Sequence, residues 1–471
     1  MSRVVIVGGS VAGLACALAM AEHGREVLVL ERGGPPPDGP AAEAAQRWAR
    51  PTAPSYPHAH TLTSLGVATL LDRAPQVIAS ALDAGATMLD LVRAKPSDPP
   101  GSEPGDAELL ALACRRATLE LVLYRIVREL PAVRIRHGVR VRELTLNTRR
   151  DRVTGVVAEG GERIAAELVL DATGRRAMAR DWLAAHGIML PPDRTSPSGF
   201  RGFTRFYRRL GQTAALNRGN ATGVLGEHYA SVLHPGDGGT FSVALLVLPE
   251  DRVMRSLRHA AAFTAVAEAT PGIVDWLAPG MSTPISQVRT ITSPHNRMRA
   301  LALSPAPPVT GLIPVGDAAC VTNPLYGRGV SLALAQAFRL ADLVASDAGP
   351  ALGRAAAGLA AELFVPWYRQ ATADDAERLA VWRAAAYGTP APPPPRHLTM
   401  RMIARVANAD AVVWRGLVRV LMGLNRPAEI LSDVEFEHRV RELLRAGADQ
   451  QLGPTRADLL EVVARAKVPG P

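Results

Sequence analysis

Residues 2–13 read SRVVIVGGSVAG, and this stretch decides the fold of the N-terminal region. Its first six residues are rich in valine and isoleucine and predict a short buried strand that leads into a glycine turn. Residues 14–23 predict an Ala- and Leu-rich helix closed by Gly24, and residues 27–30 predict a second buried strand that ends at Glu31. This strand–turn–helix–strand order is a βαβ unit, so we expect a parallel sheet with helices packed against it.

The glycine turn has the spacing of a dinucleotide clamp. In such a clamp, a pyrophosphate lies at the N-terminus of the helix, and an acidic residue about twenty positions on binds a ribose hydroxyl. Ser10 stands where the second glycine of the motif is usual. Because serine is small and its hydroxyl can donate to a phosphate oxygen, we interpret Ser10 as a variant of the motif. The turn and Glu31 therefore predict a dinucleotide site, in preference to a chance glycine turn.

The composition excludes several classes of protein. A chain of 471 residues exceeds the usual size of one hydrophobic core and predicts two or three domains. No signal peptide fits before the first strand and no run of about eighteen apolar residues occurs, so we expect a cytoplasmic protein without a transmembrane segment. The cysteines, Cys16, Cys114 and Cys320, are too scattered to indicate a disulfide framework or a metal site. The net charge of +9 comes from dispersed arginines, so we expect no nucleic-acid partner.

The pattern along the chain predicts an α/β protein in four segments. Residues 109–130 predict a long helix, and short alternating strands fill residues 133–170. The predicted segments are the first part of the nucleotide-binding domain (1–195), an inserted antiparallel-sheet substrate domain (196–305), the second part of the nucleotide-binding domain (306–350) and a helical C-terminal region (351–471). The fold class is therefore a Rossmann-like βαβ domain with an inserted antiparallel sheet and C-terminal helices.

Two further turns resemble parts of a nucleotide site. Residues 171–174 read DATG, and residues 316–319 read GDAA, followed by NPLYGRG at 323–329. A strand that ends in Gly-Asp before a glycine-rich helix start offers a carboxylate for ribose or ribityl hydroxyls and amides for an anionic group. One such turn is weak evidence for a nucleotide site, but three turns in this order indicate a larger dinucleotide cofactor.

On these motifs the chain resembles the class A flavoprotein monooxygenases with the para-hydroxybenzoate hydroxylase fold. It is most similar to the polyether-type olefin epoxidases and related FAD-dependent oxidoreductases, and the resemblance extends over about residues 3–382. It implies that Glu31 binds the adenosine ribose, Arg116 the middle of FAD, and Asp317 the ribityl and pyrophosphate region. The full set of implied FAD-binding residues is Gly8, Gly9, Ser10, Val11, Ala12, Gly13, Glu31, Arg32, Arg50, Arg116, Val141, Gly316, Asp317, Pro324, Gly327 and Gly329.

The resemblance also implies a reaction. Reduced flavin forms a C4a-hydroperoxide with dioxygen and passes one oxygen atom to an olefin or an aromatic ring, so the flavin itself is the catalyst and the catalytic side chains are unknown. We expect an apolar small-molecule substrate, in secondary metabolism. The alternative is a flavin-dependent reductase or a redox-neutral cyclase of an isoprenoid-like substrate. A non-catalytic binding protein would be expected to lose the Gly316-Asp317 turn, which this chain keeps.

The electron source is open between two routes. The chain has no second glycine clamp for NAD(P)H, and it has Ser55 and Pro57 where the relatives carry Gln and Arg. We therefore expect reduction by transiently bound NAD(P)H or by a separate flavin reductase.

Six residues are candidates for substrate contact. Phe203, Arg205 and Tyr207 share one face of a predicted strand, and Tyr326 lies in the loop expected near the flavin. His58 and His60 complete the set, although both can equally be polar loop residues that bond to backbone, and Tyr326 can serve packing alone. No third ligand lies at a helpful spacing from the histidines, so we expect no metal.

Residues 398–424 predict helices with one apolar side and interspersed arginines. We expect these helices to pack on the substrate domain. Peripheral membrane contact or a lid over the site is the alternative.

Overall fold

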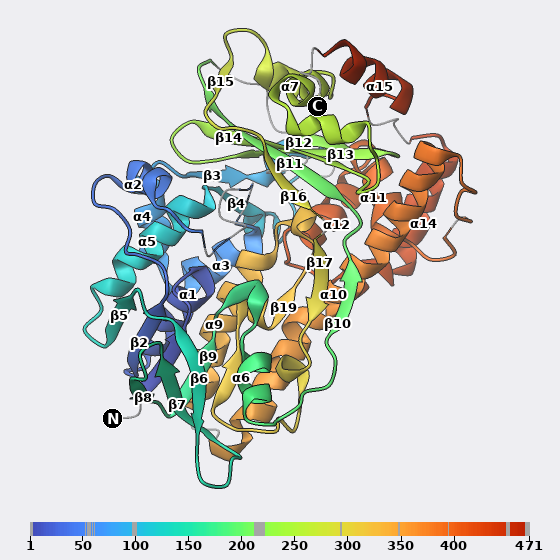
Figure 1. Cartoon of the computed structure of the whole chain (residues 1–471). Helices are drawn as coiled ribbons and strands as arrows, with labels where there is room; N and C mark the ends of the chain where they lie inside the picture. Colours follow the sequence, from blue (N-terminus) through green and yellow to red (C-terminus); the bar gives the residue numbers. More distant parts are fainter. Residues whose placement is uncertain are drawn as a thin grey trace.

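The structure is a computed structural model that describes residues 3–51, 53, 58, 60, 62–96, 101–211, 222–292, 294–346, 349–393, 395–448 and 453–466 (Figure 1). It has the predicted class: a parallel sheet with helices, an inserted antiparallel sheet and C-terminal helices.

A five-stranded parallel sheet forms the centre of the nucleotide-binding region, and β1 is its middle strand. The strand order is β18 (Leu312–Pro314), β9 (Leu168–Asp171), β1 (Arg3–Val7), β2 (Glu26–Glu31) and β5 (Val133–His137). All four neighbouring pairs run parallel. The carboxyl ends of the strands therefore meet at one edge, where the glycine turn, Glu31 and Asp171 lie together.

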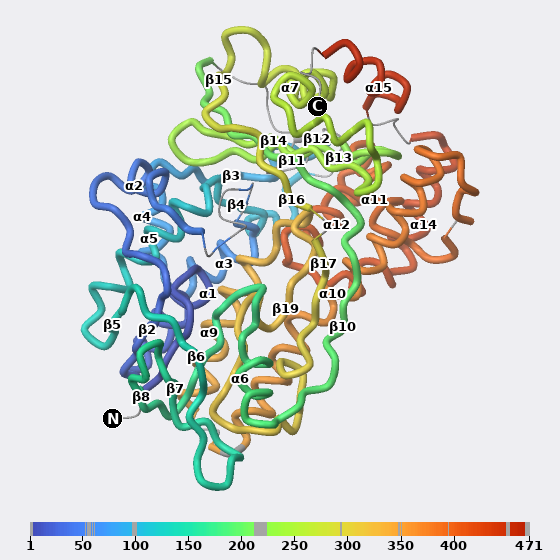
Figure 2. Tube along the Cα trace, in the orientation of Figure 1, coloured from blue at the N-terminus to red at the C-terminus, as the bar shows by residue number. Residues whose placement is uncertain are grey.

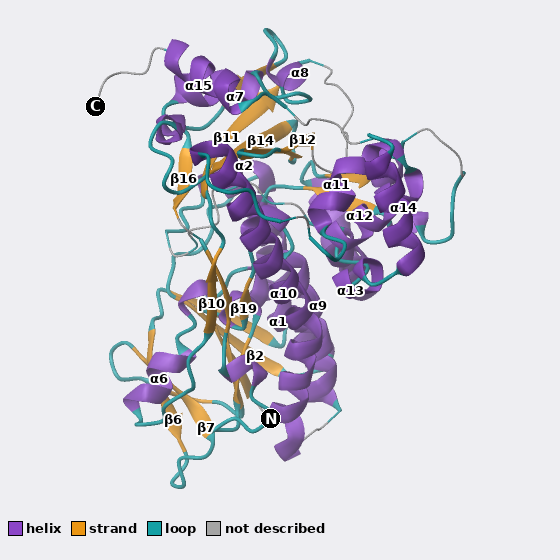
Figure 3. Ribbon diagram, turned by 90° about the vertical axis from the view of Figure 1, so that its right-hand side faces the viewer, coloured by secondary structure: helices purple, strands orange, loops and turns teal. Residues whose placement is uncertain are grey.

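The two faces of this sheet are covered differently (Figure 3). Val4 and Ile6 point into a core shared with α1 (Val11–Glu22), α5 (Arg116–Arg128) and α9 (Gly329–Ala345). Val5 and Val7 point the other way, into a core with the small sheet β6 (Val141–Leu146), β7 (Val153–Ala158) and β8 (Arg163–Ala165) and with α6 (Ala179–Ala185). Both faces of β1 are therefore buried, as its apolar sequence predicts.

The prediction of one long helix over residues 109–130 is wrong. Residues Leu110–Ala113 form β4, which pairs with β3 (Thr87–Asp90), and α5 begins only at Arg116. The helix preference of Leu and Ala is weak here beside the hydrogen bonds and burial that pairing with β3 provides.

The inserted sheet has β14 (Thr240–Val247) at its centre, between β13 (Tyr229–Pro235) and β11 (Arg201–Arg209). Its other strands are β12 (Thr222–Leu225), β15 (Ser282–Pro284) and β16 (Arg289–Thr292). The chain enters through β10 (Arg194–Pro197) and returns through β17 (His295–Met298), and these two strands pair antiparallel. One face of the sheet packs against α7 (Ala260–Glu268), α8 (Val274–Leu277) and α15 (Arg456–Arg465). Figure 2 shows α15, near the end of the chain, beside this sheet.

The C-terminal region is helical. The long helix α10 (Leu352–Tyr387) contacts α9, and α11 (Met400–Val406), α12 (Ala411–Leu421) and α14 (Val434–Arg445) form a group beside it. Ile403, Val413 and Leu417 are buried in a common core, so the apolar side of residues 398–424 faces the interior. No helix of the described residues is long and apolar enough to cross a membrane.

Candidate cofactor and substrate site

The glycine turn after β1 is too tight for side chains. Gly8 has a φ of +114°, and a Cβ atom there would lie 2.3 Å from the carbonyl oxygen of Ala172. A Cβ atom at Gly13 would lie 1.9 Å from the carbonyl oxygen of Gly8. The backbone at the start of α1 therefore adopts a geometry that only glycine permits, which leaves the helix N-terminus open to a ligand.

A buried polar network lies next to this turn. Glu120, on α5, is fully buried and forms an ion pair of 2.8 Å with Arg50 and one of 3.6 Å with Arg116. The Ser10 hydroxyl donates to Glu120 Oε2 at 2.7 Å and accepts from Arg116 Nη2 at 3.1 Å. This corrects our expectation for Ser10, because its proton is held by Glu120 and is not directed at a phosphate. The sequence signal for Glu120 was its position four residues after Arg116 on the same helix.

Glu31 also serves the turn itself. Its two carboxylate oxygens accept the backbone N–H of Gly9 at 2.8 Å and that of Gly33 at 2.6 Å. Arg50 Nη1 lies 3.4 Å from Glu31 Oε1, yet Arg50 Nε and Nη1 have no hydrogen-bond acceptor among the described residues. These buried N–H groups fit an anionic ligand, because an unpaired buried donor is costly.

A first cavity of about 280 Å³ adjoins the turn, with the end of β2 and residues 139–141 in its wall. Burial and the neighbouring Arg176 and Arg140 lower the pKa of Arg32 in its wall. Arginines outnumber carboxylates in this wall, so it suits a diphosphate. The predicted residues that line it are Gly8, Ser10, Glu31, Arg32, Arg50, Arg116, Val141 and Asp317, joined by Arg140, Arg175 and Arg176, which the sequence reasoning missed.

The DATG turn contributes backbone to the same wall. Asp171 is fully buried, and its carboxylate accepts from the N–H and hydroxyl of Thr173 and from the N–H of Ala179. Burial raises the pKa of Asp171, while these hydrogen bonds lower it. Asp171 thus fixes the turn, and Ala172, Thr173 and Gly174 face the cavity.

A second cavity of about 380 Å³ continues from the first, since Ser10, Arg116 and Asp317 line both. Asp317 lies 3.6 Å from Arg175 Nε, an ion pair at the junction. The other predicted cofactor residues in this wall are Val11, Ala12, Pro324, Gly327 and Gly329.

Three predicted glycines lie behind the walls of these cavities. The N–H of Gly316 donates to Gln336 Oε1 at 2.7 Å, and the N–H of Gly9 donates to Glu31. Gly13 lies against the backbone of Gly8. These glycines therefore shape the turns, and the amides of Gly9 and Gly316 are engaged within the protein.

Histidines line the second cavity in neutral form. Burial lowers the pKa of His58 to about 4 and that of His60 to about 3. His234, on β13, also lines the cavity, and burial lowers its pKa to about 4. His58 Nδ1 lies 3.4 Å from Thr204 Oγ1, and His60 Nδ1 lies 2.8 Å from the carbonyl oxygen of His58. The structure thus places both predicted histidines at the site and adds His234, for which the sequence gave no signal.

The prediction for β11 is wrong about which face meets the cavity. Thr204 and Gly202 line the second cavity, whereas Phe203 and Tyr207 are buried on the opposite side with α7 and α8. Arg205 donates to Thr264 Oγ1 on α7 at 3.0 Å. Phe203, Arg205 and Tyr207 do share one face of the strand, as predicted, but that face packs beneath the covering helices.

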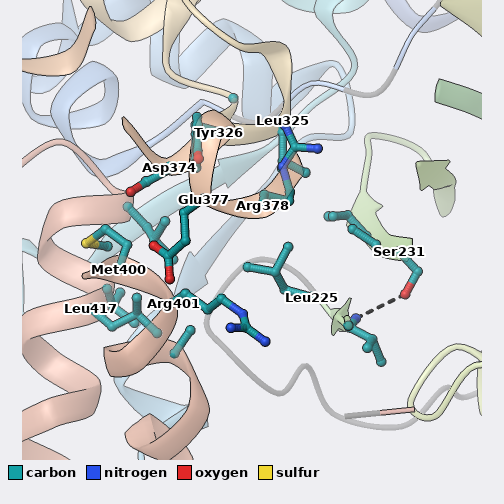
Figure 4. A pocket seen from close by; sticks show the side chains of 18 of the residues that line it. Leu225, Ser231, Leu325, Tyr326, Asp374, Glu377, Arg378, Met400, Arg401 and Leu417 are labelled. Carbon is teal, nitrogen blue, oxygen red and sulfur yellow. Dashed lines mark hydrogen bonds between the residues drawn. The ribbon is translucent and has the colours of Figure 1, made fainter. Parts of the chain in front are cut away.

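A third cavity, of about 180 Å³, adjoins the second and shares Val232, His234, Leu325 and Gly327 with it. It lies between β12 and β13, the Tyr326 loop, and helices α10, α11 and α12 (Figure 4). Tyr326 faces this cavity and donates to Asp374 Oδ2 at 3.2 Å. Most of the wall is apolar, with Leu225, Leu325, Met400, Leu417, Val418 and Leu421 among its residues.

The residues present fit FAD. The tight turn at Gly8 and Gly13, the buried donors of Arg50 and the arginine-rich first cavity suit a diphosphate and adenosine, and the joined second cavity leaves room for a ring system. Among the residues that the structure describes, no group of three or more His, Cys, Asp or Glu side chains could hold a metal ion. Ser55 and Pro57 lie outside the described residues.

Comparison with known proteins agrees with this geometry. Residues 3–94 match the family model of the FAD dependent oxidoreductases. The curated Protein Rv3254 of Mycobacterium tuberculosis is 27% identical over 371 residues, which cover 72% of each chain.

Solved structures share the fold at low identity. PqsL of Pseudomonas aeruginosa, a probable FAD-dependent monooxygenase, is 16% identical, with a TM-score of 0.57 over 82% of this chain and 100% of that chain. The Diels-Alderase PyrE3 of pyrroindomycin biosynthesis is 18% identical, with a TM-score of 0.59 over 90% of this chain and 81% of that chain. Residues 3–94 are therefore similar to the FAD dependent oxidoreductase family, and the chain shares the fold of these solved structures.

Proposed function

We propose that the protein is an FAD-dependent monooxygenase that adds one oxygen atom of dioxygen to an apolar small molecule, by epoxidation or hydroxylation. The observation that carries this proposal is the apolar third cavity, which shares four wall residues with the cavity suited to the flavin end of FAD. A substrate in the third cavity can thus reach the flavin without leaving the protein.

When bound, FAD supplies the redox chemistry, including the activation of dioxygen. The chain holds and orients the reactants. The glycine turn and Arg50 would hold the diphosphate. Asp317 lies where the first and second cavities join, and Gly327 lies where the second and third join. The neutral histidines and the aliphatic wall exclude bulk water, which favours oxygen transfer over release of hydrogen peroxide.

The proposal includes the supply of electrons. We propose transient NAD(P)H or a partner flavin reductase as the reductant, a cytoplasmic location, and a place in secondary metabolism. The single glycine clamp supports the proposal about the reductant, because the described residues contain no second turn of this kind that could hold a nicotinamide nucleotide.

Isotopically labelled dioxygen tests the reaction. FAD-loaded protein with a reductant and candidate apolar substrates should give a product that carries one labelled oxygen atom, seen by mass spectrometry. A product without label, formed at the same rate in the absence of oxygen, would overturn the proposal.

A redox-neutral cyclase is the second candidate. The fold similarity to a Diels-Alderase favours it, since that neighbour shows that this fold accommodates cyclisation. The same experiment separates the two, because a cyclase needs neither oxygen nor reductant.

A further inference from the structure

We propose that the substrate of the third cavity carries one hydrogen-bond-donating group, a hydroxyl or an ammonium, and that the carboxylate of Asp374 accepts from it. This inference rests on the proposed function for the location of the substrate, and it adds the chemistry by which the protein recognises that substrate.

Asp374 is one of the few charged side chains that line this mostly apolar cavity. One of its oxygens, Oδ2, accepts from the Tyr326 hydroxyl at 3.2 Å and from Gln370 Nε2. No described residue donates to Oδ1. Among the described residues, the buried side-chain atoms without a partner do not include this oxygen, so it is accessible from the cavity that Asp374 lines. Oδ1 is therefore free to accept from a ligand in the cavity.

The cations near the cavity do not satisfy this oxygen. Arg378 donates to Asp375 at 2.8 Å and to the carbonyl oxygens of Ser198 and Gly199. Arg401 pairs with Glu227 at 3.0 Å, at the rim of the cavity. Both guanidinium groups thus pair with other acceptors, and neither donates to Asp374 Oδ1; the buried Nε of Arg378 has no acceptor among the described residues.

Glu377 adds a second acceptor to the same wall. It lies one helical turn after Asp374 on α10, and Figure 4 shows its carboxylate directed toward Arg401 and Leu417. An apolar pocket with a few converging acceptors selects a mainly hydrocarbon ligand with one donor group, because an unpaired polar group in such a pocket is costly.

The orientation of Asp374 is fixed from behind. Arg328 donates to Gln370 Oε1 at 2.7 Å, so Gln370 must present its Nε2 group to Asp374. In Asp374→Asn, the side-chain oxygen would face Gln370 and the NH2 group would face the cavity. The variant therefore keeps the internal hydrogen bonds and replaces the acceptor in the cavity with a donor.

The ionisation of Asp374 changes near neutral pH. Burial raises its pKa to about 7, with Glu377 and Asp375 on α10 adding to the rise and Arg328 and the Tyr326 hydroxyl opposing it. An ammonium needs the ionised carboxylate, so its affinity should rise about tenfold from about pH 6 to about pH 8, as the ionised fraction grows. A hydroxyl can either donate or accept, so its affinity should change little.

The test uses FAD-loaded protein and three probes of one shape: phenylbutylamine, phenylbutanol and the methyl ether of phenylbutanol. Calorimetric titration should show that the amine or the alcohol binds at least tenfold more tightly than the ether, and the pH profile identifies which donor is preferred. Asp374→Asn should abolish this preference while the FAD content stays unchanged.

Glu362→Gln is the matched control, because Glu362 lies on the same helix in surface ion pairs with Arg339 and Arg426. It should leave the preference intact. Equal binding of all three probes, or a preference that survives in Asp374→Asn, would overturn the inference. Because the readout is binding and not turnover, it stays valid if oxygen transfer fails.

Discussion

At the scale of single residues, the walls of the site are supported by a buried carboxylate, Glu120, that is far from the glycine turn in sequence. Glu120 joins Arg50, Arg116 and the Ser10 hydroxyl, and it is fully buried. A buried carboxylate is stable only with such partners, and it offsets the charge of the two guanidinium groups in turn. The variant glycine position at Ser10 is therefore part of this network.

Glu120→Gln should lower the free energy of unfolding of the FAD-free protein by ~3 kcal/mol, since it removes the buried anion that Arg50 and Arg116 share. Added FAD should recover part of this loss, because its diphosphate supplies negative charge at the same place. Urea denaturation with and without FAD measures both effects. Glu162→Gln is the control: it breaks an exposed pair with Arg136 and should cost less than ~1 kcal/mol. A Glu120→Gln protein as stable as the wild type would refute the structural role of this network.

At the scale of elements, β11 shows what alternation determines and what it leaves open. The sequence predicts that Phe203, Arg205 and Tyr207 share one face, and they do. It does not say which face meets the cavity, because that depends on α7 and α8, which come later in the chain and cover the apolar side. The small side chains of Gly202 and Thr204 leave space on the other side.

Thr204→Leu should raise the dissociation constant of FAD about tenfold. The larger side chain enters the second cavity, and overpacking of this kind costs ~1–3 kcal/mol. Fluorescence titration with FAD gives the constant. Arg205→Gln, on the opposite face, should bind FAD as the wild type does. If Arg205→Gln weakened FAD and Thr204→Leu did not, the assignment of the faces would be wrong.

Site residues with a local sequence signature could be predicted, whereas those that depend on contacts between distant segments could not. The residues of the glycine turn have a local signature, so the sequence places Gly8 and Gly13 correctly. Arg175 directly follows the DATG turn, so its place in the cavity wall has a local sequence signal. The pairing of Ser10 with Glu120 joins segments 110 residues apart, and no local pattern encodes it. The same holds for Asp374, whose role depends on α10 lying against the Tyr326 loop.

At the scale of the whole molecule, the site is assembled from every part of the chain. The parallel sheet provides the glycine turn, the inserted sheet provides Thr204 and His234, and the C-terminal helices provide the wall of the third cavity. Asp237, in a hairpin of the inserted sheet, is fully buried and pairs with Arg115 and Thr118 at the start of α5. This contact joins the inserted sheet to the nucleotide-binding region, so the cavities keep their relative positions.

The measurement that tests the central claim most directly is the flavin content of the purified protein. The joined first and second cavities predict yellow protein with one FAD per chain, released intact on denaturation. Visible absorption before and after denaturation, with mass spectrometry of the released cofactor, gives the result. A colourless protein that gains no flavin absorption when FAD is added would contradict the account.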